Sequence, residues 1–190
     1  MNQKKDLFMG NEKRVKFLDP AVIEATIAEV AEMAAREDID AALIGGVAMM
    51  AYGSDRLTKD VDVALVDEYL PGVEHVEELI FGGVVARTPQ GHTVKLVVRS
   101  DEYRPLYVAA VDHAVDVGLP LKVVRPDYLL ALKMAAARDK DVSDVKTLVV
   151  LGAVDVRSAR KIVKEHLGEY AARELDALVD KAHWQKSRAR

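Results

Sequence analysis

A short apolar run that ends at a glycine pair, followed by two closely spaced acids, constrains the fold of this chain more than any other feature. Residues 41–44 are all apolar and stop at Gly45 and Gly46, a pattern typical of a buried strand that leads into a tight turn and a short helix. The next alternation of polar and apolar residues predicts a second strand, on which Asp60 and Asp62 share one face. The sequence therefore predicts a mixed core of strands and helices at this point.

The remaining elements are predicted from apolar spacing and from helix caps and breakers. Asp19 followed by proline is a typical helix start. The predicted helices are 20–37, 47–52, 73–81, 103–110, 126–138, 142–151, 155–167 and 169–184, and the predicted strands are 41–44, 59–66, 84–87, 92–98 and one or two short pieces within 114–124. Asp141 and Gly168 are predicted to mark helix boundaries. We therefore expect an α/β (α+β) fold, with a mixed-sheet core over residues 1–124 and a helical region over 125–190 packed on it.

Composition and charge exclude several classes of function. The chain of 190 residues has no cysteine, which excludes disulfides, zinc knuckles, iron–sulfur clusters and a thiol nucleophile. The net charge of −4 argues against a protein that grips nucleic acid over a broad basic face, although both termini carry basic patches that are either solvated ends or RNA contacts. No apolar run reaches the ~20 residues of a membrane span, and no signal peptide is recognisable, so we expect a cytoplasmic protein without a membrane partner.

Asp60 and Asp62 are candidate ligands for a divalent cation. Carboxylates two residues apart on a strand project the same way, about 6–7 Å apart at a rise of ~3.3 Å per residue. Hard cations such as Mg²⁺ take carboxylate and phosphate oxygens, and a glycine turn before a helix lets backbone amides approach phosphates. The pair therefore suits a metal-bound triphosphate. The alternative is a solvated sheet face on which the two acids pair with Arg56 and Lys59.

Lys133 is the one charged residue in the apolar run 129–137, and it shares a helix face with apolar neighbours. A buried ammonium needs a partner, either a nucleotide phosphate or a carboxylate such as Asp60, Asp62 or Asp144. The alternative is a lysine whose stem covers apolar surface while its amine reaches water.

Two segments resemble one known family. Residues 43–63 resemble the signature of the DNA polymerase beta-like nucleotidyltransferase superfamily, with matching residues at Gly45, Gly46, Arg56, Thr58, Asp60 and Asp62. Residues 129–145 resemble a segment of its small bacterial AbiEii-like branch, with matching residues at Lys133, Arg138, Asp141 and Asp144. The resemblance covers about residues 20–150 and implies a nucleotidyltransferase core with a mixed sheet.

The resemblance also implies a reaction and a set of residue roles. The chain would bind a nucleoside triphosphate with Mg²⁺ and transfer the nucleotidyl group to a hydroxyl of an acceptor, either a tRNA or a small molecule, and an antitoxin protein is an implied partner. The implied catalytic residues are Asp60, Asp62, Lys133 and Asp144, of which Asp60 and Asp62 ligate the metal. The implied nucleotide-binding residues are Gly45, Gly46, Arg56, Thr58, Lys133 and Arg138.

The strand after the acid pair departs from the family pattern. The position at which a third carboxylate is expected holds Lys95, and a cation there competes with metal. Asp101 and Asp112 are candidate replacements for the missing acid. In-line phosphoryl transfer depends mainly on positioning and electrostatics, so we favour an enzyme. The alternative is a catalytically lapsed module that keeps the fold to bind a nucleotide or a protein.

Overall fold

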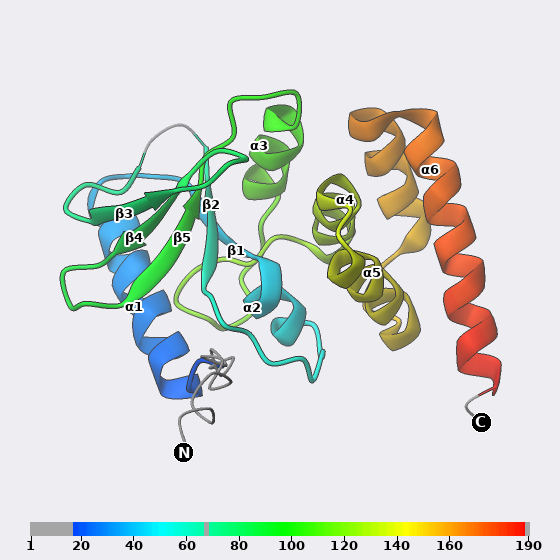
Figure 1. Ribbon diagram of the computed structural model, residues 1–190, viewed down its shortest axis with the longest axis horizontal. Helices are drawn as coiled ribbons and strands as arrows, with labels where there is room; N and C mark the ends of the chain where they lie inside the picture. Colours follow the sequence, from blue (N-terminus) through cyan, green and yellow to red (C-terminus); the bar gives the residue numbers. More distant parts are fainter. Residues whose placement is uncertain (1–16, 67–68, 189–190) are drawn as a thin grey trace, which may run out of the picture.

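The computed structural model describes residues 17–66 and 69–188, and it has an α/β fold built on a five-stranded mixed sheet (Figure 1). The strands are β1 (Ala41–Ile44), β2 (Asp62–Leu65), β3 (Glu74–Glu78), β4 (Val84–Arg87) and β5 (Thr93–Val97). The helices are α1 (Pro20–Arg36), α2 (Gly45–Ala51), α3 (Arg104–Asp112), α4 (Pro126–Ala136), α5 (Asp139–Leu151) and α6 (Val156–Arg188). Helices α4, α5 and α6 lie together beside the part that contains the sheet (Figure 1). The predicted fold class is confirmed.

The middle of the sheet is a parallel pair of strands. The strand order is β1-β2-β5-β4-β3, with β2 and β5 parallel and all other neighbours antiparallel. This register sets Asp62 directly opposite Lys95. Parallel partners in register point to the same face of a sheet, so the two side chains share one face. No helix in the described ranges is long and apolar enough to cross a membrane.

The outer edge of β1 is covered by the chain that leads to α4. The Leu43 N–H donates to the Lys122 carbonyl at 2.8 Å, and the Val124 N–H donates to the Leu43 carbonyl at 3.1 Å. The strands expected within residues 114–124 are reduced to isolated bridges. This cover satisfies edge groups that would otherwise be open to a second chain.

Helix α1 packs against the sheet and holds one of its turns. Asp19 caps the helix by accepting a hydrogen bond from the Ala21 N–H at 2.8 Å, as predicted. Glu29 lies on the buried face of α1, where it accepts the Gln90 N–H at 2.9 Å and contacts the His92 ring at 3.0 Å. Burial alone would raise the pKa of Glu29, but hydrogen bonding to the Thr88 side chain, followed by that to the Gln90 backbone and to His92, lowers it. The helix is therefore tied to the β4–β5 turn through a buried carboxylate.

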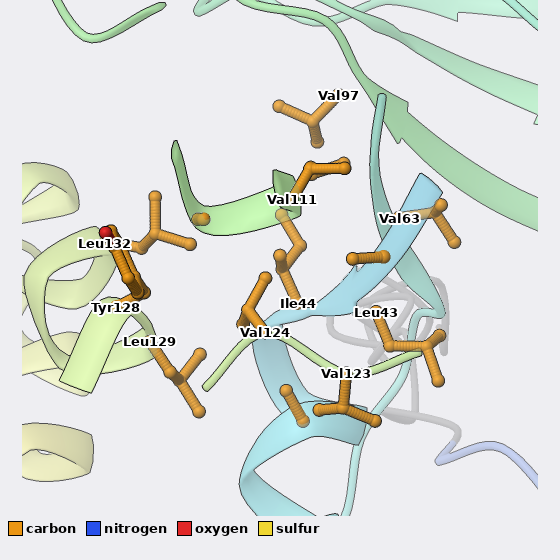
Figure 2. Close-up of a cluster of buried hydrophobic side chains, with 14 of the residues drawn as sticks. Leu43, Ile44, Val63, Val97, Val111, Val123, Val124, Tyr128, Leu129 and Leu132 are labelled. Carbon is orange, nitrogen blue, oxygen red and sulfur yellow. The ribbon is translucent and has the colours of Figure 1, made fainter. Parts of the chain in front are cut away.

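One apolar cluster joins the sheet to the helices (Figure 2). Its members come from β1, β2, β5, α3, the covering segment and α4: Leu43, Ile44, Val63, Val97, Val111, Val123, Val124, Tyr128, Leu129 and Leu132. Burial of such side chains contributes roughly 1.5–3 kcal/mol each relative to exposure. The cluster therefore fixes α3 and α4 against the sheet and sets the walls of the site described below.

The helix predicted over residues 73–81 is wrong, because this segment forms β3 and its turn. All five residues of β3 are exposed, so this segment has no apolar face packed on the core of the kind that would stabilise a helix. Its backbone groups pair with β4 instead, through a turn at Gly82 and Gly83. Gly83 has φ +109, and a Cβ there would lie 2.2 Å from the Leu96 carbonyl oxygen. Because Gly83 has no Cβ, its backbone can lie close to the Leu96 carbonyl of β5 at the start of β4.

The helix boundaries in the C-terminal part were predicted with mixed success. Asp141 is not a cap: α5 begins at Asp139, so Asp141 lies inside the helix and is fully buried. The reason is Ala137, whose left-handed φ of 51° ends α4 and lets α5 begin two residues later. Gly168 divides α6 as predicted, with non-helical φ 88 and ψ 173.

Candidate functional site

A cavity of about 700 Å³ lies where the sheet meets α4 and α5. Its walls come from the β1–α2 junction, the loop before β2, strand β5 and helices α3, α4 and α5. The cavity brings together the residues singled out from the sequence: Gly45, Gly46, Arg56, Thr58, Asp60, Asp62, Lys95, Lys133, Arg138, Asp141 and Asp144. Asp101 and Asp112, the candidate replacements for a third acid, are not among its described lining residues.

Gly45 and Gly46 are required by the side chains that pack on them. Gly45 has φ +64, and a Cβ at this position would lie 2.1 Å from Asp62 Oδ2. A Cβ at Gly46 would lie 2.4 Å from Thr58 Oγ1. The Thr58 hydroxyl in turn donates to the Asp60 carbonyl at 2.8 Å, which fixes the loop before β2. The glycine pair therefore makes room for the Asp62 and Thr58 side chains, a use that the sequence pattern does not reveal.

Asp60 and Asp62 both face the cavity but differ in their partners. Strand β2 begins at Asp62, so Asp60 precedes the strand, contrary to prediction. The Lys95 amine lies 2.8 Å from Asp60 Oδ2. No described group donates a hydrogen bond to the Asp62 carboxylate, whose oxygens are thus left to the cavity. Burial raises the pKa of Asp62, and the charge of Lys95 offsets this only in part.

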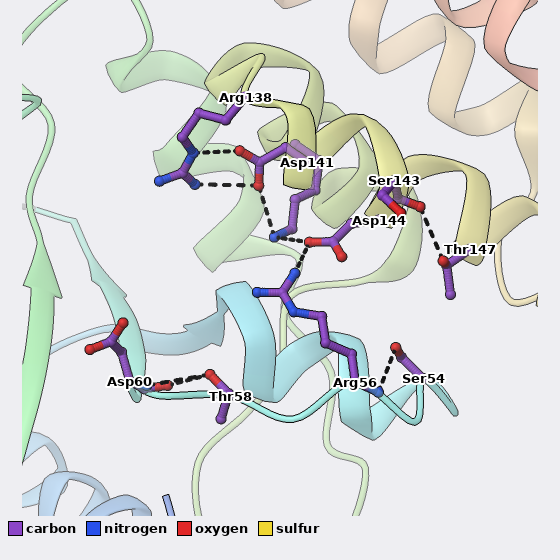
Figure 3. A network of polar contacts seen from close by, with 10 residues as sticks. Ser54, Arg56, Thr58, Asp60, Arg138, Asp141, Ser143, Asp144 and Thr147 are labelled. Carbon is purple, nitrogen blue, oxygen red and sulfur yellow. Dashed lines mark hydrogen bonds and ion pairs between the residues drawn. The ribbon is translucent and has the colours of Figure 1, made fainter. Parts of the chain in front are cut away.

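Lys133 lies at the centre of a buried ion-pair network. Its side chain is only 6% exposed, and its amine lies 2.7 Å from Asp144 Oδ2 and 3.1 Å from Asp141 Oδ1. Figure 3 shows the outer members: Arg138 binds Asp141, and Arg56 reaches from the loop before β2 to Asp144 on α5. Lys133 is thus buried and bound to carboxylates, so the alternative of an amine in water is wrong for this residue.

The network has two consequences for the site. Burial alone would raise the pKa of Asp141, but Arg138 and Lys133 outweigh it and lower the pKa. The expected phosphate-binding cations Arg56, Lys133 and Arg138 each carry a carboxylate partner already. Their main structural effect is to hold α4, α5 and the loop before β2 together around the cavity.

Two further cations line the cavity: the sequence analysis weighed Lys59 only as a partner of the acid pair, and it did not single out Lys140. Lys59 and Lys140 both line it, and neither makes an ion pair with a described carboxylate. Burial lowers the pKa of Lys140, and the nearby charges of Arg138 and Arg56 lower it further. In the sequence Lys140 stands between two acids and looks like a solvated helix residue. Only the phase of α5 shows that it points to the cavity side.

Another part of the cavity lining is aromatic and apolar. Phe81, Val97 and Tyr107 line it, from the β3–β4 turn, β5 and α3. The Arg99 guanidinium lies over the rings of Phe81 and Tyr107, at 5.7 and 5.3 Å from their centroids. Burial raises the pKa of Tyr107, so its phenol stays neutral at physiological pH. The sequence offered no signal for this wall, because Phe81 was assigned to a helix.

The carboxylates that line the cavity suit the Mg²⁺ that the sequence implies. Magnesium is commonly held by one or two carboxylates, with substrate phosphates and water as further ligands. Asp60 and Asp62 supply two such carboxylates at the cavity wall. Within the described ranges, no cluster of three or more histidine, cysteine, aspartate or glutamate side chains is placed to hold a metal. The residues therefore fit an ion completed by substrate oxygens, and not a cage made by the protein alone.

Comparison with solved structures identifies the fold. The chain matches an antigenic nucleotidyltransferase-like protein from Paracoccidioides brasiliensis (TM-score 0.50, 18% identity, 87% of this chain and 95% of that chain). It also matches the antibiotic-resistance factor ANT(2'')-Ia (TM-score 0.54, 15% identity, 83% and 97%) and a proposed nucleotidyltransferase from H. pylori (TM-score 0.50, 14% identity, 90% and 95%). No protein-family model and no curated protein matches the chain. The fold is therefore that of nucleotidyltransferase-like proteins.

Proposed function

We propose that this protein transfers a nucleotidyl group from a nucleoside triphosphate, bound with Mg²⁺, to a hydroxyl group of an acceptor. The observation that carries the proposal is a cavity lined by two carboxylates, Asp60 and Asp62, and by two cations, Lys59 and Lys140, that make no ion pair with a described carboxylate. Its described lining contains six lysine and arginine residues and four aspartates, an excess of two positive charges in a chain of net charge −4. This local excess favours a polyphosphate anion.

Each wall has a distinct role in the proposal. Lys140 and Lys59 bind phosphate oxygens, because among the described lining residues they are the cations that make no ion pair with a carboxylate of residues 17–66 or 69–188. Lys133 and Asp144 hold the network in place, and Arg56 and Arg138 add positive potential at its edge. Asp60 and Asp62 hold the metal, which when bound neutralises phosphate charge.

The reaction follows from these positions. The acceptor hydroxyl oxygen forms a bond to the α-phosphorus, and the bond from that phosphorus to the oxygen bridging to the β-phosphate breaks. Pyrophosphate leaves with the electron pair of the broken bond, and the hydroxyl proton passes to solvent. Lys140 stabilises negative charge on the leaving phosphates, because its side chain lines the cavity and makes no ion pair with a described carboxylate.

A second candidate function is a module that binds nucleotide without transferring it. The ion pair between Lys95 and Asp60 favours it, because an ammonium on one carboxylate competes with metal there. Nucleotide binding alone would still use Lys59 and Lys140. The two functions differ in whether a labelled nucleotide becomes covalently attached to an acceptor.

The acceptor and partners proposed here rest on the resemblance of residues 129–145 to the AbiEii-like branch. They are a tRNA as acceptor and an antitoxin protein as partner in a toxin–antitoxin pair. A small hydroxyl compound as acceptor rests instead on the resemblance of residues 43–63 to the wider superfamily. A toxin would inhibit growth on expression, and growth would return on coexpression of the partner.

The first test is binding, followed by transfer. Thermal unfolding is followed with each nucleoside triphosphate and Mg²⁺, and a bound nucleotide at a hundred times its Kd should add about 2.7 kcal/mol of stability. Transfer is then measured with α-labelled nucleotide and with tRNA or small hydroxyl acceptors. Asp62→Asn should abolish transfer, whereas Asp180→Asn, an exposed acid on α6 outside the cavity, should leave it unchanged. Binding without any transfer would support the second candidate, and no binding would refute both.

A further inference from the structure

Lys95 faces the acid pair from the neighbouring strand, and the sheet fixes its position. The register of β2 and β5 pairs Lys95 with Asp62. The Lys95 N–H donates to the carbonyl of Val61, the residue between the two acids, at 2.9 Å. Its amine lies 2.8 Å from Asp60 Oδ2. The backbone of Lys95 is therefore fixed beside the acid pair by the sheet, and its side chain lies on the face that the acids share.

The Lys95 amine occupies a position like that of one of the two ions in a two-metal site. Two-metal phosphoryl-transfer sites hold their ions about 3.5–4 Å apart. The Lys95 amine takes up the room beside Asp60 Oδ2 that such an ion would need, while the Asp62 carboxylate keeps its oxygens toward the cavity. The side chains of Lys95 and Asp60 are 29% and 42% exposed, so the pair can be reached by ions from solution.

We propose that Lys95 is a tethered cation that replaces one metal ion, so that the site holds a single divalent cation with the nucleotide. The proposal deepens the proposed function and rests on it. Asp62 and Asp60, which both line the cavity, would hold the remaining ion together with substrate phosphates. One fixed positive charge and one exchangeable ion then face the polyphosphate.

The experiment counts bound ions directly. Mn²⁺ is titrated into the full chain, with and without a nucleotide analogue whose α,β-bridging oxygen is replaced by methylene so that no transfer occurs. Free Mn²⁺ is measured by electron paramagnetic resonance. The wild type should bind one Mn²⁺ per chain in the presence of the analogue. Lys95→Glu, which restores an acid at this position, should bind two.

Further variants separate charge from fold. Repulsion between a unit charge and a divalent ion about 4 Å apart corresponds to roughly thirtyfold in affinity in water. Because the pair is partly exposed, we expect Lys95→Met to bind Mn²⁺ at least about fivefold more tightly, with or without nucleotide. Lys95→Arg should keep the wild-type count. Lys122→Met removes the same charge from an exposed lysine outside the cavity and should change nothing.

The outcomes are distinct from those of the function test. Two Mn²⁺ ions in the wild type, or an unchanged Mn²⁺ affinity in Lys95→Met, would overturn the tethered-cation proposal. Failure of the wild type to bind any nucleotide would refute the proposed function instead. In that case the titration without nucleotide still decides whether Lys95 competes with metal. Circular dichroism and thermal unfolding confirm that each variant is folded.

Discussion

Replacing Lys133 with methionine tests whether the buried network needs its central cation. The lysine amine contacts Asp144 and Asp141 at 2.7 and 3.1 Å, and both carboxylates are nearly or fully buried. Removing one partner of a buried ion pair costs about 3–5 kcal/mol, because the other charge stays buried without compensation. Arg138 and Arg56 still hold one carboxylate each, and methionine fills the lysine stem volume. We therefore expect a loss near the lower end, about 3 kcal/mol.

Urea unfolding at pH 7 measures this loss. With a slope of about 2 kcal/mol per M, the midpoint should fall by about 1.5 M without a change of slope. Lys161→Met, an exposed lysine on α6, serves as the matched control and should stay within about 0.5 kcal/mol of wild type. The double variant with Asp144→Asn should lose less than the sum of the single losses, since the two side chains are in contact.

The pH dependence gives an independent check of the same reasoning. The folded-state pKa of Asp141 is lowered, so its contribution to stability is full above its ordinary pKa and is lost as pH falls through the lower, folded value. Without Lys133 that folded value rises, and the acid loss should begin at higher pH. A loss below about 1 kcal/mol with an unchanged acid profile would refute the view that Lys133 neutralises buried carboxylates.

Three further predictions concern single positions. Glu29→Gln should lower the free energy of unfolding in urea by about 1–2 kcal/mol and make stability depend less on pH at acid pH. The reason is that the folded-state pKa of Glu29 is lowered, so its contribution to stability is lost as pH falls below the usual pKa of a glutamate. Glu24→Gln, exposed on the same helix, is the control. Gly45→Ala should weaken Mn²⁺ binding at least about tenfold, because its Cβ would meet Asp62 Oδ2 at 2.1 Å; unchanged binding in calorimetry would contradict the packing described. Lys140→Gln should weaken nucleotide binding about tenfold in a thermal-shift titration. It should also raise the stability of the nucleotide-free protein at pH 7, because the lowered pKa of Lys140 means that folding disfavours its charged form. A variant less stable than wild type would count against this.

Local patterns were enough to predict the parts of the site that lie close together in the chain. The glycine pair and Asp60 and Asp62 follow one another within 18 residues, and the unusual charge of Lys133 stands out against its apolar neighbours. The helix cap at Asp19 was predictable for the same reason, because capping is decided by the next few residues. These features depend on local backbone geometry, which a sequence pattern expresses directly.

Contacts between distant segments could not be predicted in this way. The partner of Lys133 includes Asp141, which looked like a helix cap until α5 was seen to begin earlier. Lys140 becomes a cavity residue only through the orientation of α5. The segment after residue 73 has a helical spacing of apolar residues, yet it forms a strand that pairs with β4. Its residues are exposed, so a helix there would have had no apolar face to bury. Tertiary packing decides each of these cases.

The contact between Arg56 and Asp144 joins residues 88 positions apart in the chain. It crosses the boundary between the sheet-bearing half and the helical half, and so each half supplies only part of the wall around the cavity. Neither half would therefore keep the site if it were expressed alone or grafted onto another scaffold. Because the Asp144 carboxylate is only 5% exposed and the apolar cluster also crosses this boundary, salt screens the contact little, and raising ionic strength should leave the enclosure closed until the fold itself unfolds.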